Sequence, residues 1–243
     1  MLSNKKTYYL KNYSRYKKNL LKILNKRINQ NAIDKKYFSY GKRYYLAKQK
    51  ASSIQHRNLL VELGSGYGET LKYLSFVCNF KKSIGVDLAY KNTHYHNNIK
   101  FIYGDLDKKF PFKTKSVDYL IAMMVFEHLF DPFHAFKELS RILSDDGIAI
   151  INLPLITSIK NRFRLLFGLM LETSVPYDLW IKNKEWDGNH LHYFTIKSIK
   201  DICLLNNLEI IDLGTVGKFK IIKDIFPSFL ANEITFSVKK IIH

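Results

Sequence analysis

Residues 61–70, VELGSGYGET, decide the fold of this chain. The apolar run from Leu59 to Leu63 has the length and composition of a buried strand, and a helical pattern follows from about Glu69. The glycines between them let the backbone turn tightly and pass close beneath a ligand. The following helix presents unpaired N–H groups above the carboxyl end of the strand. This stretch therefore predicts a nucleotide-binding loop at the edge of a parallel α/β sheet.

The spacing of the glycines and one acidic residue narrow the choice of ligand. Gly64, Gly66 and Gly68 alternate with other residues, and Glu69 stands where a dinucleotide-binding loop has its third glycine. Glu62 precedes the first glycine by two residues. Its carboxylate would repel a pyrophosphate but suits a ligand that carries an ammonium and a sulfonium group. The charge pattern therefore favours S-adenosyl-L-methionine.

Two further acidic residues follow the next predicted strands. Asp87 ends the run SIGVD, where a carboxylate accepts hydrogen bonds from ribose hydroxyls, a role that NAD-binding folds share. Asp105 lies in YGDLD, after the following strand. Its carboxylate can accept a hydrogen bond from an adenine amino group, with Leu106 as an apolar neighbour of the ring. Both residues are expected at the same edge of the sheet as the glycine loop.

Outward from this loop, short apolar runs alternate with helical patterns, which is typical of βα units. We expect an α/β fold with a Rossmann-like, seven-stranded sheet, helices on both faces and an N-terminal helical extension. Thr195 is the expected N-cap of a late helix. We divide the chain into a basic extension, 1–52, and an α/β domain, 53–243, with an insert at about 155–190. The expected strands are 59–63, 82–86, 100–103, 117–123, 147–152, 208–213 and 234–239.

The ordered motifs VELGSGYGET, IGVDL, YGDLD and the segment 110–154 resemble the class I S-adenosylmethionine-dependent methyltransferases, in particular their quinone-methyltransferase-like branch. The segment NHLHYFTIKSIKDICLLNNLEIIDL is similar to the distal region of that branch. The resemblance implies an enzyme that transfers a methyl group. It also implies a cofactor site formed by Glu62, Gly64, Ser65, Gly66, Gly68, Asp87, Leu88, Asp105, Leu106 and the backbone around Met123.

Three histidines are candidates for the general base of a methyl transfer. His128 in FEHL follows the fourth predicted strand and is the first choice, while His190 and His192 in DGNHLHYF are second choices. Each of them is also compatible with a structural role. Some quinone O-methyltransferases resemble this segment but have an acidic residue three positions before the Glu-His pair, where this chain has Met124. We therefore expect no metal ion.

The insert and the extension carry the information on the methyl acceptor. The insert is apolar and aromatic, and it is compatible either with a lid over an apolar substrate or with a helix packed on the sheet. Residues 1–60 contain 16 Lys and Arg against the single Asp34, a net charge of +15. Residues 9–28 have the pattern of a basic amphipathic helix. Such a helix suits an anionic membrane, RNA phosphates, or simple coverage of the domain in solvent.

The remaining function classes are narrowed by composition and by missing motifs. The two cysteines, Cys78 and Cys203, and the absence of any run of roughly 20 apolar residues favour a cytoplasmic protein, with peripheral membrane contact through residues 1–50 as an option. The expected substrate is a small-molecule or lipid-linked acceptor. An RNA methyltransferase is the alternative, although the chain lacks the Asn-Pro-Pro-aromatic and Pro-Cys motifs. A non-catalytic cofactor-binding scaffold and an oxidoreductase also stay open.

Overall fold

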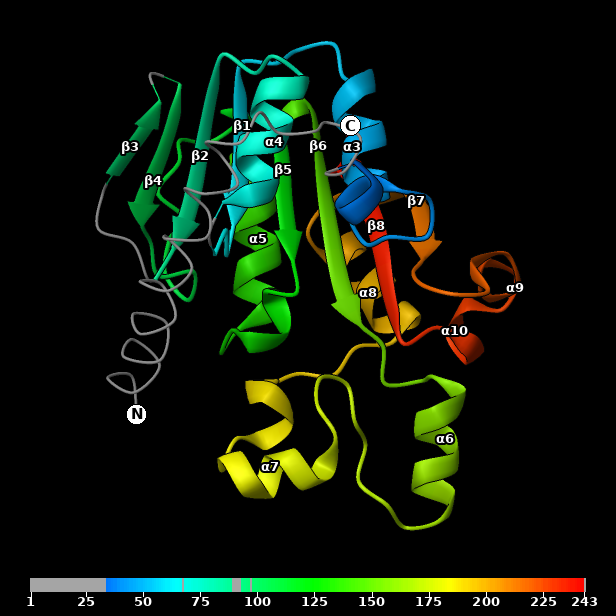
Figure 1. Ribbon diagram of the computed structural model, residues 1–243. Helices are drawn as coiled ribbons and strands as arrows, with labels where there is room; N and C mark the ends of the chain where they lie inside the picture. The colour runs from blue at the N-terminus through cyan, green and yellow to red at the C-terminus, as the bar shows by residue number, and fades with distance from the viewer. Residues whose placement is uncertain (1–33, 67, 89–92, 97, 243) are drawn as a thin grey trace.

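The computed structural model describes residues 34–66, 68–88, 93–96 and 98–242 (Figure 1). The basic amphipathic helix expected at 9–28 lies outside the described residues. Within them, one sheet runs through the centre and helices cover both of its faces, while an insert hangs below one end of the sheet.

The sheet has eight strands in the order β3-β4-β2-β1-β5-β6-β8-β7. All five strands from β4 to β6 in this order are parallel, β8 is antiparallel to its neighbours β6 and β7, and β3 is antiparallel to β4. The seven expected strands are present, and β3 adds an edge strand that the sequence did not predict. The strands are β1 (Leu59–Leu63), β2 (Lys82–Asp87), β3 (Thr93–His96), β4 (Ile99–Tyr103), β5 (Val117–Met123), β6 (Leu143–Pro154), β7 (Leu208–Thr215) and β8 (Glu233–Lys240).

Helices pack on both faces of this sheet, as expected for an α/β fold. The helices α5 and α8 cover one face, and α3 and α4 cover the other. The helical elements are η1 (Asp34–Phe38), α3 (Tyr45–Ser53), α4 (Glu69–Val77), η2 (Phe126–His128), α5 (Pro132–Ile142), α6 (Ile159–Leu166), α7 (Tyr177–Asn183), η3 (Trp186–Asn189), α8 (Ile196–Leu205), α9 (Lys220–Ile225) and α10 (Pro227–Leu230).

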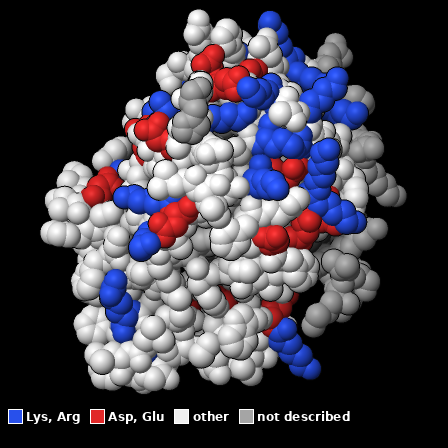
Figure 2. Space-filling view, turned by 180° about the vertical axis from the view of Figure 1, so that it is seen from behind, with Lys and Arg blue, Asp and Glu red and all other residues white. Residues whose placement is uncertain are grey.

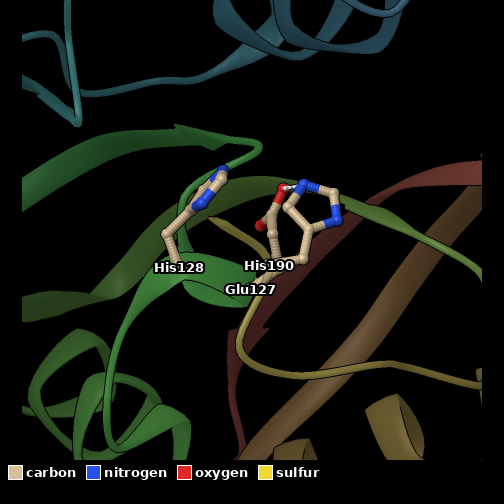
Figure 3. Close-up of side chains that lie close together, drawn as sticks. All are labelled: Glu127, His128 and His190. Atoms are coloured by element: carbon tan, nitrogen blue, oxygen red, sulfur yellow. Dashed lines mark ion pairs between the residues drawn. The ribbon is translucent and has the colours of Figure 1, made fainter. Parts of the chain in front are cut away.

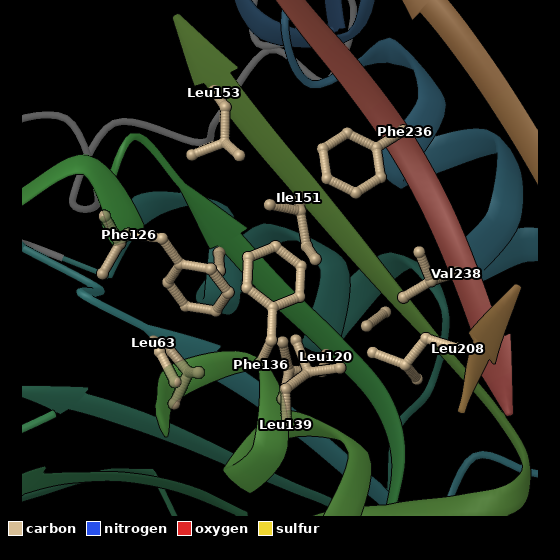
Figure 4. Packing of buried hydrophobic residues seen from close by; sticks show 14 of the residues in the cluster. Leu63, Leu120, Phe126, Phe136, Leu139, Ile151, Leu153, Leu208, Phe236 and Val238 are labelled. Atoms are coloured by element: carbon tan, nitrogen blue, oxygen red, sulfur yellow. The ribbon is translucent and has the colours of Figure 1, made fainter. Parts of the chain in front are cut away.

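The core consists of two apolar layers, one on each side of the sheet. Leu120 of β5 packs into the layer under α5, whereas its neighbours Tyr119 and Ile121 pack into the layer under α3 and α4. This alternation follows from the two-residue period of a strand. Figure 4 shows the first layer, in which Phe136 and Leu139 of α5 lie against residues of the sheet. Burial on both faces makes the central strands rigid supports for the residues at their ends.

The N-terminal segment before β1 packs on the sheet. Ala47 and Ala51 of α3 are fully buried, and the hydroxyl of Tyr119 donates a hydrogen bond to the carbonyl of Ala47. The sequence pattern at about 35–52 indicates a helix with Gly41 as a weak point in its middle, and the chain forms η1 and α3 on either side of that glycine. Gly41 lies between them with φ of +84°, a left-handed conformation that a helix interior does not allow. Its carbonyl accepts a hydrogen bond from the N–H of Gly217.

The capping expectation for α8 is confirmed. The Thr195 side chain accepts a hydrogen bond from the N–H of Ser198, and the Ser198 hydroxyl accepts one from the N–H of Thr195. This reciprocal cap fixes where the chain leaves the insert and enters the helix.

Candidate functional site

The parallel strands bring the ends of β1, β2, β4, β5 and β6 to one edge of the sheet. Leu63 is paired with Val86 of β2 on one side and with Ala122 of β5 on the other. The glycine loop that follows β1 therefore lies between the ends of β2 and β5. In open parallel sheets, ligands bind in the crevice at this edge.

The glycine loop is shaped for close approach of a ligand. Gly64 has φ of +61°, and a Cβ atom built on it would lie 2.5 Å from Cγ2 of Val125. Gly66 has φ of +50°, and no atom of the described residues is recorded within 4 Å of the position of its Cβ. Gly64 therefore allows the loop to pack against the chain after β5. Gly66 leaves open space on the side where a ligand is expected.

Asp87, the last residue of β2, supports the loop from the neighbouring strand. Its Oδ2 atom accepts a hydrogen bond from the N–H of Gly66 at 3.0 Å. Ser65 adds a second link, because its N–H donates to the carbonyl of Val86 at 3.1 Å. The predicted cofactor residues of the first two strands therefore form one connected unit. Leu88, the next predicted residue, is exposed beside it.

Glu62 is buried at the end of β1, and its Oε2 atom accepts a hydrogen bond from the N–H of Leu71 at 3.0 Å. Burial, together with the nearby charge of Asp87, raises the pKa of its carboxyl to about 8. Lys72 lies close by, and burial lowers the pKa of its ammonium to about 8. A buried carboxyl with a raised pKa favours a cationic group that would compensate its charge.

The predicted adenine-side residues lie after β4. The Asp105 carboxylate accepts a hydrogen bond from the N–H of Asp107 at 3.1 Å and pairs with Lys108 at 3.5 Å. Leu106 is buried against the core. Met123 ends β5, and the chain after it turns sharply, since Met124 has φ of +56°. The N–H of Met124 donates to the carbonyl of Asn152 in β6, which holds this turn in place.

Two of the three predicted histidines meet after β5. The rings of His128 and His190 are 4.7 Å apart between centroids and nearly perpendicular (Figure 3). Glu127 points toward them, and its Oε1 atom lies 3.9 Å from Nε2 of His190. One potential ligand atom from each of these three residues lies within 4.8 Å of the others. We call Glu127, His128 and His190 the Glu-His-His cluster.

Burial dominates the electrostatics of this cluster. It raises the pKa of the Glu127 carboxyl to about 8. It lowers the pKa of His190 to about 4, with the neighbouring His128 acting in the same direction. Among the described residues, neither carboxylate oxygen of Glu127 has a hydrogen-bond partner. Glu127 is a functional candidate that the sequence prediction left out, although its position next to His128 is a signal that was available.

His192 does not join the cluster. Its Nε2 atom lies 3.1 Å from the carbonyl oxygen of Phe130. The N–H groups of both Leu191 and His192 donate to the carbonyl of Glu127, so the backbone of this segment is held against η2. The segment that carries His192 therefore positions His190, while the His192 ring lies elsewhere.

The insert exposes an apolar surface at the end of the molecule that carries few charged side chains in Figure 2. Its large apolar side chains from Phe163 to Met170 are exposed and are not packed on the sheet. The helices α9 and α10 add further exposed apolar side chains, and the Arg162 guanidinium lies 5.2 Å from the ring centre of Phe229, which joins the two parts. This apolar surface comprises Phe163, Leu165, Leu166, Phe167, Leu169, Met170, Phe219, Ile221, Ile222, Ile225, Phe226 and Phe229.

Comparison with known proteins gives a family match over part of the chain. Residues 61–151, which contain the glycine loop, Asp87, Asp105 and the Glu127-His128 pair, match a family described as "Methyltransferase domain". A search of curated proteins gave no match. No helix among the described residues is long and apolar enough to cross a membrane.

Several solved structures share the fold. An S-adenosylmethionine-dependent methyltransferase from Mesorhizobium loti has a TM-score of 0.57 at 14% identity, covering 82% of this chain and 99% of that one. One from Thermotoga maritima, described as a possible histamine N-methyltransferase, has a TM-score of 0.51 at 19% identity, covering 82% and 90%. The YcgJ protein of Bacillus subtilis has a TM-score of 0.54 at 12% identity, covering 82% and 99%. At these identities the likeness concerns the fold.

Proposed function

We propose that this chain, which carries a class I S-adenosylmethionine-dependent methyltransferase domain, transfers a methyl group to an oxygen or nitrogen atom of a small or lipid-linked acceptor. The position of the Glu-His-His cluster carries the proposal. It follows β5, and β5 pairs with β1, which leads into the glycine loop. A donor held by the loop and an acceptor held at the cluster would therefore meet at one edge of the sheet.

The loop and the strand ends fit the cofactor. The open side of Gly66 gives a ligand access to the backbone, and Asp87 stands where a carboxylate accepts hydrogen bonds from ribose hydroxyls. We assign Asp105 and Leu106 to the adenine. The buried carboxyl of Glu62 suits a cationic ligand. When bound, S-adenosylmethionine supplies an activated methyl group on a sulfonium sulfur, which keeps the electron pair of the broken bond.

The cluster supplies a base beside this cofactor site. We assign proton removal to His128, because it is the more exposed of the two clustered histidines. Its Nδ1 atom is 3.0 Å from the carbonyl oxygen of Asn189, so Nδ1 carries the hydrogen and Nε2 carries the lone pair. Nε2 would accept the proton that an acceptor O–H or N–H gives up. The chain's other contribution is to orient the acceptor toward the methyl group and to exclude water.

The apolar surface favours a lipid-linked acceptor. It groups twelve large apolar side chains, and exposed patches of this kind mark interaction sites on proteins. On α6, basic side chains stand beside exposed apolar ones, since Arg162 and Arg164 flank Phe163. Residues 1–50 add positive charge, which would attract an anionic membrane. We therefore propose peripheral membrane contact that brings the site to an acceptor in the lipid phase.

Two measurements test the proposed function. Isothermal titration of the full chain with S-adenosylmethionine and with NAD should show binding of the first and not of the second, and the opposite result would contradict the proposal. Methyl transfer from labelled cofactor is then measured with lipid, small-molecule and RNA fractions of the source cell. Label in the lipid or small-molecule fraction is the expected result. Label found only in RNA would mean that the acceptor is RNA and not a small or lipid-linked molecule. Cofactor binding without label in any fraction would indicate a non-catalytic scaffold.

A further inference from the structure

We propose that Glu127, His128 and His190 form a binding site for a divalent transition-metal cation beside the methyl-transfer site. The three side chains converge after β5 (Figure 3), and one potential ligand atom from each lies within 4.8 Å of the others. Two imidazole nitrogens and one carboxylate oxygen suit Zn²⁺ and its first-row neighbours. The binding site itself does not depend on the proposed function, whereas its role in the reaction rests on it.

The surroundings of the Glu127 carboxylate support a cation site. The residue is 0% exposed, and neither oxygen has a hydrogen-bond partner within the part of the chain that the structure describes. Ionising a buried carboxyl that has no hydrogen bond costs roughly several kcal/mol, and a bound cation would offset this cost. Nε2 of the neutral His190 lies 3.9 Å from Oε1 of Glu127, which is too long for a hydrogen bond. A cation between the two side chains would satisfy both.

The hydrogen bonds of His190 give it the tautomer that a metal ligand needs. The hydroxyl of Thr173 donates to Asp187, which as a carboxylate can only accept. The hydroxyl oxygen of Thr173, 2.8 Å from Nδ1 of His190, must therefore accept the Nδ1 hydrogen. This leaves the lone pair on Nε2, the atom that faces Glu127. Histidines that bind metals usually donate the N–H of their other ring nitrogen to a polar partner.

His128 shows the same arrangement with a different partner. Its Nδ1 atom is 3.0 Å from the carbonyl oxygen of Asn189, and a carbonyl can only accept. Asn189 directly precedes His190 in the chain, so one short segment orients both rings. Asp187, which is buried, accepts hydrogen bonds from the N–H groups of Thr173 and Ser174 and holds that segment in place. This short segment therefore holds both imidazole rings beside the Glu127 carboxylate, with a potential ligand atom of each residue within 4.8 Å of the others.

A cation at this site would act on an acceptor hydroxyl. Three protein ligands leave a coordination position that a hydroxyl oxygen of the acceptor would fill. Coordination makes the hydroxyl more acidic: the proton leaves to water, and the O–H electron pair stays on the oxygen that attacks the methyl carbon. In this arrangement His128 is a ligand and does not accept the proton, because its one lone pair is used for the cation. We expected no metal ion from the sequence because Met124 stands where some quinone O-methyltransferases have an acidic residue. Here the third ligand is His190 instead, 62 residues after His128.

The test uses Co²⁺ as the probe and the full chain without other metals. Binding is followed by the visible absorption of Co²⁺ and by isothermal titration. We expect one saturable site per chain, and we expect Glu127→Gln and His190→Ala each to weaken binding at least about a hundredfold. His56→Ala, an exposed histidine outside the cluster, is the matched control and should bind as the unchanged chain does. No saturable binding, or equal binding by Glu127→Gln, would overturn the proposal.

Thr173→Val provides a second variant that keeps all three ligands. It removes the acceptor of the Nδ1 hydrogen of His190 and should weaken Co²⁺ binding about tenfold. Circular dichroism checks that each variant folds, and if Glu127→Gln does not fold, Thr173→Val decides the question. Methyl transfer that persists after chelation would remove the cation from the reaction but leave the proposed function intact. Loss of S-adenosylmethionine binding in the metal-free chain would instead count against the proposed function.

Discussion

The carboxylate of Asp87 accepts a hydrogen bond from the backbone N–H of Gly66, with 3.0 Å between the two atoms. The residues are 21 positions apart and belong to neighbouring strands. The bond fixes the middle of the glycine loop to the end of β2. A loop held in place before ligand arrives loses less conformational entropy on binding, which favours affinity. Asp87 thus shapes the loop, and we propose that it also contacts the ligand.

Substitutions of Asp87 separate these two roles. Asp87→Asn keeps an oxygen that can accept the Gly66 hydrogen bond, whereas Asp87→Ala removes it. We expect Asp87→Ala to weaken S-adenosylmethionine binding about a hundredfold and Asp87→Asn about tenfold, since hydrogen bonds to charged groups contribute about 1.5–3 kcal/mol. Isothermal titration measures both. Affinity in Asp87→Ala equal to that of the unchanged chain would show that Asp87 serves neither role.

Gly64 and Gly66 should differ when each is changed to alanine. The added Cβ of Gly64→Ala would lie 2.5 Å from Val125, so this variant should lose roughly 2–4 kcal/mol of unfolding free energy. The added Cβ of Gly66→Ala meets no atom, so the loss should be about 1 kcal/mol, from the positive φ alone. Urea unfolding compares the two. Gly66→Ala should instead weaken S-adenosylmethionine binding. An affinity equal to that of the unchanged chain would show that the ligand does not lie against Gly66.

Glu62 should make the stability of the ligand-free chain depend on pH. Its folded-state pKa of about 8 lies above the ordinary value of 4.5, so the folded chain holds an extra proton between these values. The stability that Glu62 contributes is therefore fully present below about pH 4.5 and is lost as the pH rises through 8. The free energy of unfolding should be lower at pH 8 than at pH 4.5 by roughly 4 kcal/mol.

Glu62→Gln should remove this pH dependence, because the amide does not ionise and its oxygen can still accept the hydrogen bond from Leu71. Urea unfolding at pH 5 and pH 8 measures the change. The exposed Glu185→Gln is the control and should follow the unchanged chain at both values. A Glu62→Gln variant that loses as much stability as the unchanged chain would assign the pH dependence to other groups.

His128→Ala should lower turnover at least about a hundredfold, which is the usual contribution of a general base or of a metal-activated proton transfer. S-adenosylmethionine affinity should stay the same, because His128 lies in η2, beyond the predicted cofactor contact at the Met123 backbone. The assay follows label from the cofactor into the acceptor fraction, with His56→Ala as the control. Unchanged turnover would make His128 a structural residue that holds the segment at Asn189.

The apolar surface should bind vesicles that contain anionic lipid. Leu166→Asp combined with Phe226→Asp places two charges on it and should reduce pelleting about tenfold or more, since burying each side chain is worth about 1.5–3 kcal/mol. Leu204→Asp on α8, an equally exposed leucine, is the control. A chain that begins at Asp34 tests the basic extension separately. Equal pelleting by that chain would remove the extension from the membrane proposal.

Much of the fold follows from local sequence patterns. The alternation of apolar runs with helical segments predicted the seven strands, and Thr195 predicted the start of α8, because these signals act between residues close in the chain. The strand β3 was missed, since Thr93–His96 is short and carries no apolar run. Gly41 is a weak point in the helical pattern of 35–52, but its hydrogen bond with the distant Gly217 could not be predicted from local sequence.

The sequence by itself determined the class of fold and the cofactor, because the glycine loop, Glu62, Asp87 and Asp105 are read from short motifs whose order fixes their places in a parallel sheet. Only the tertiary structure decided which histidines meet. His128 follows β5 while His190 ends the insert, and backbone hydrogen bonds to Glu127 bring them together. Burial, which depends on the whole fold, then leaves the Glu127 carboxylate without a hydrogen bond to any residue that the structure describes, and no local pattern in the sequence records that.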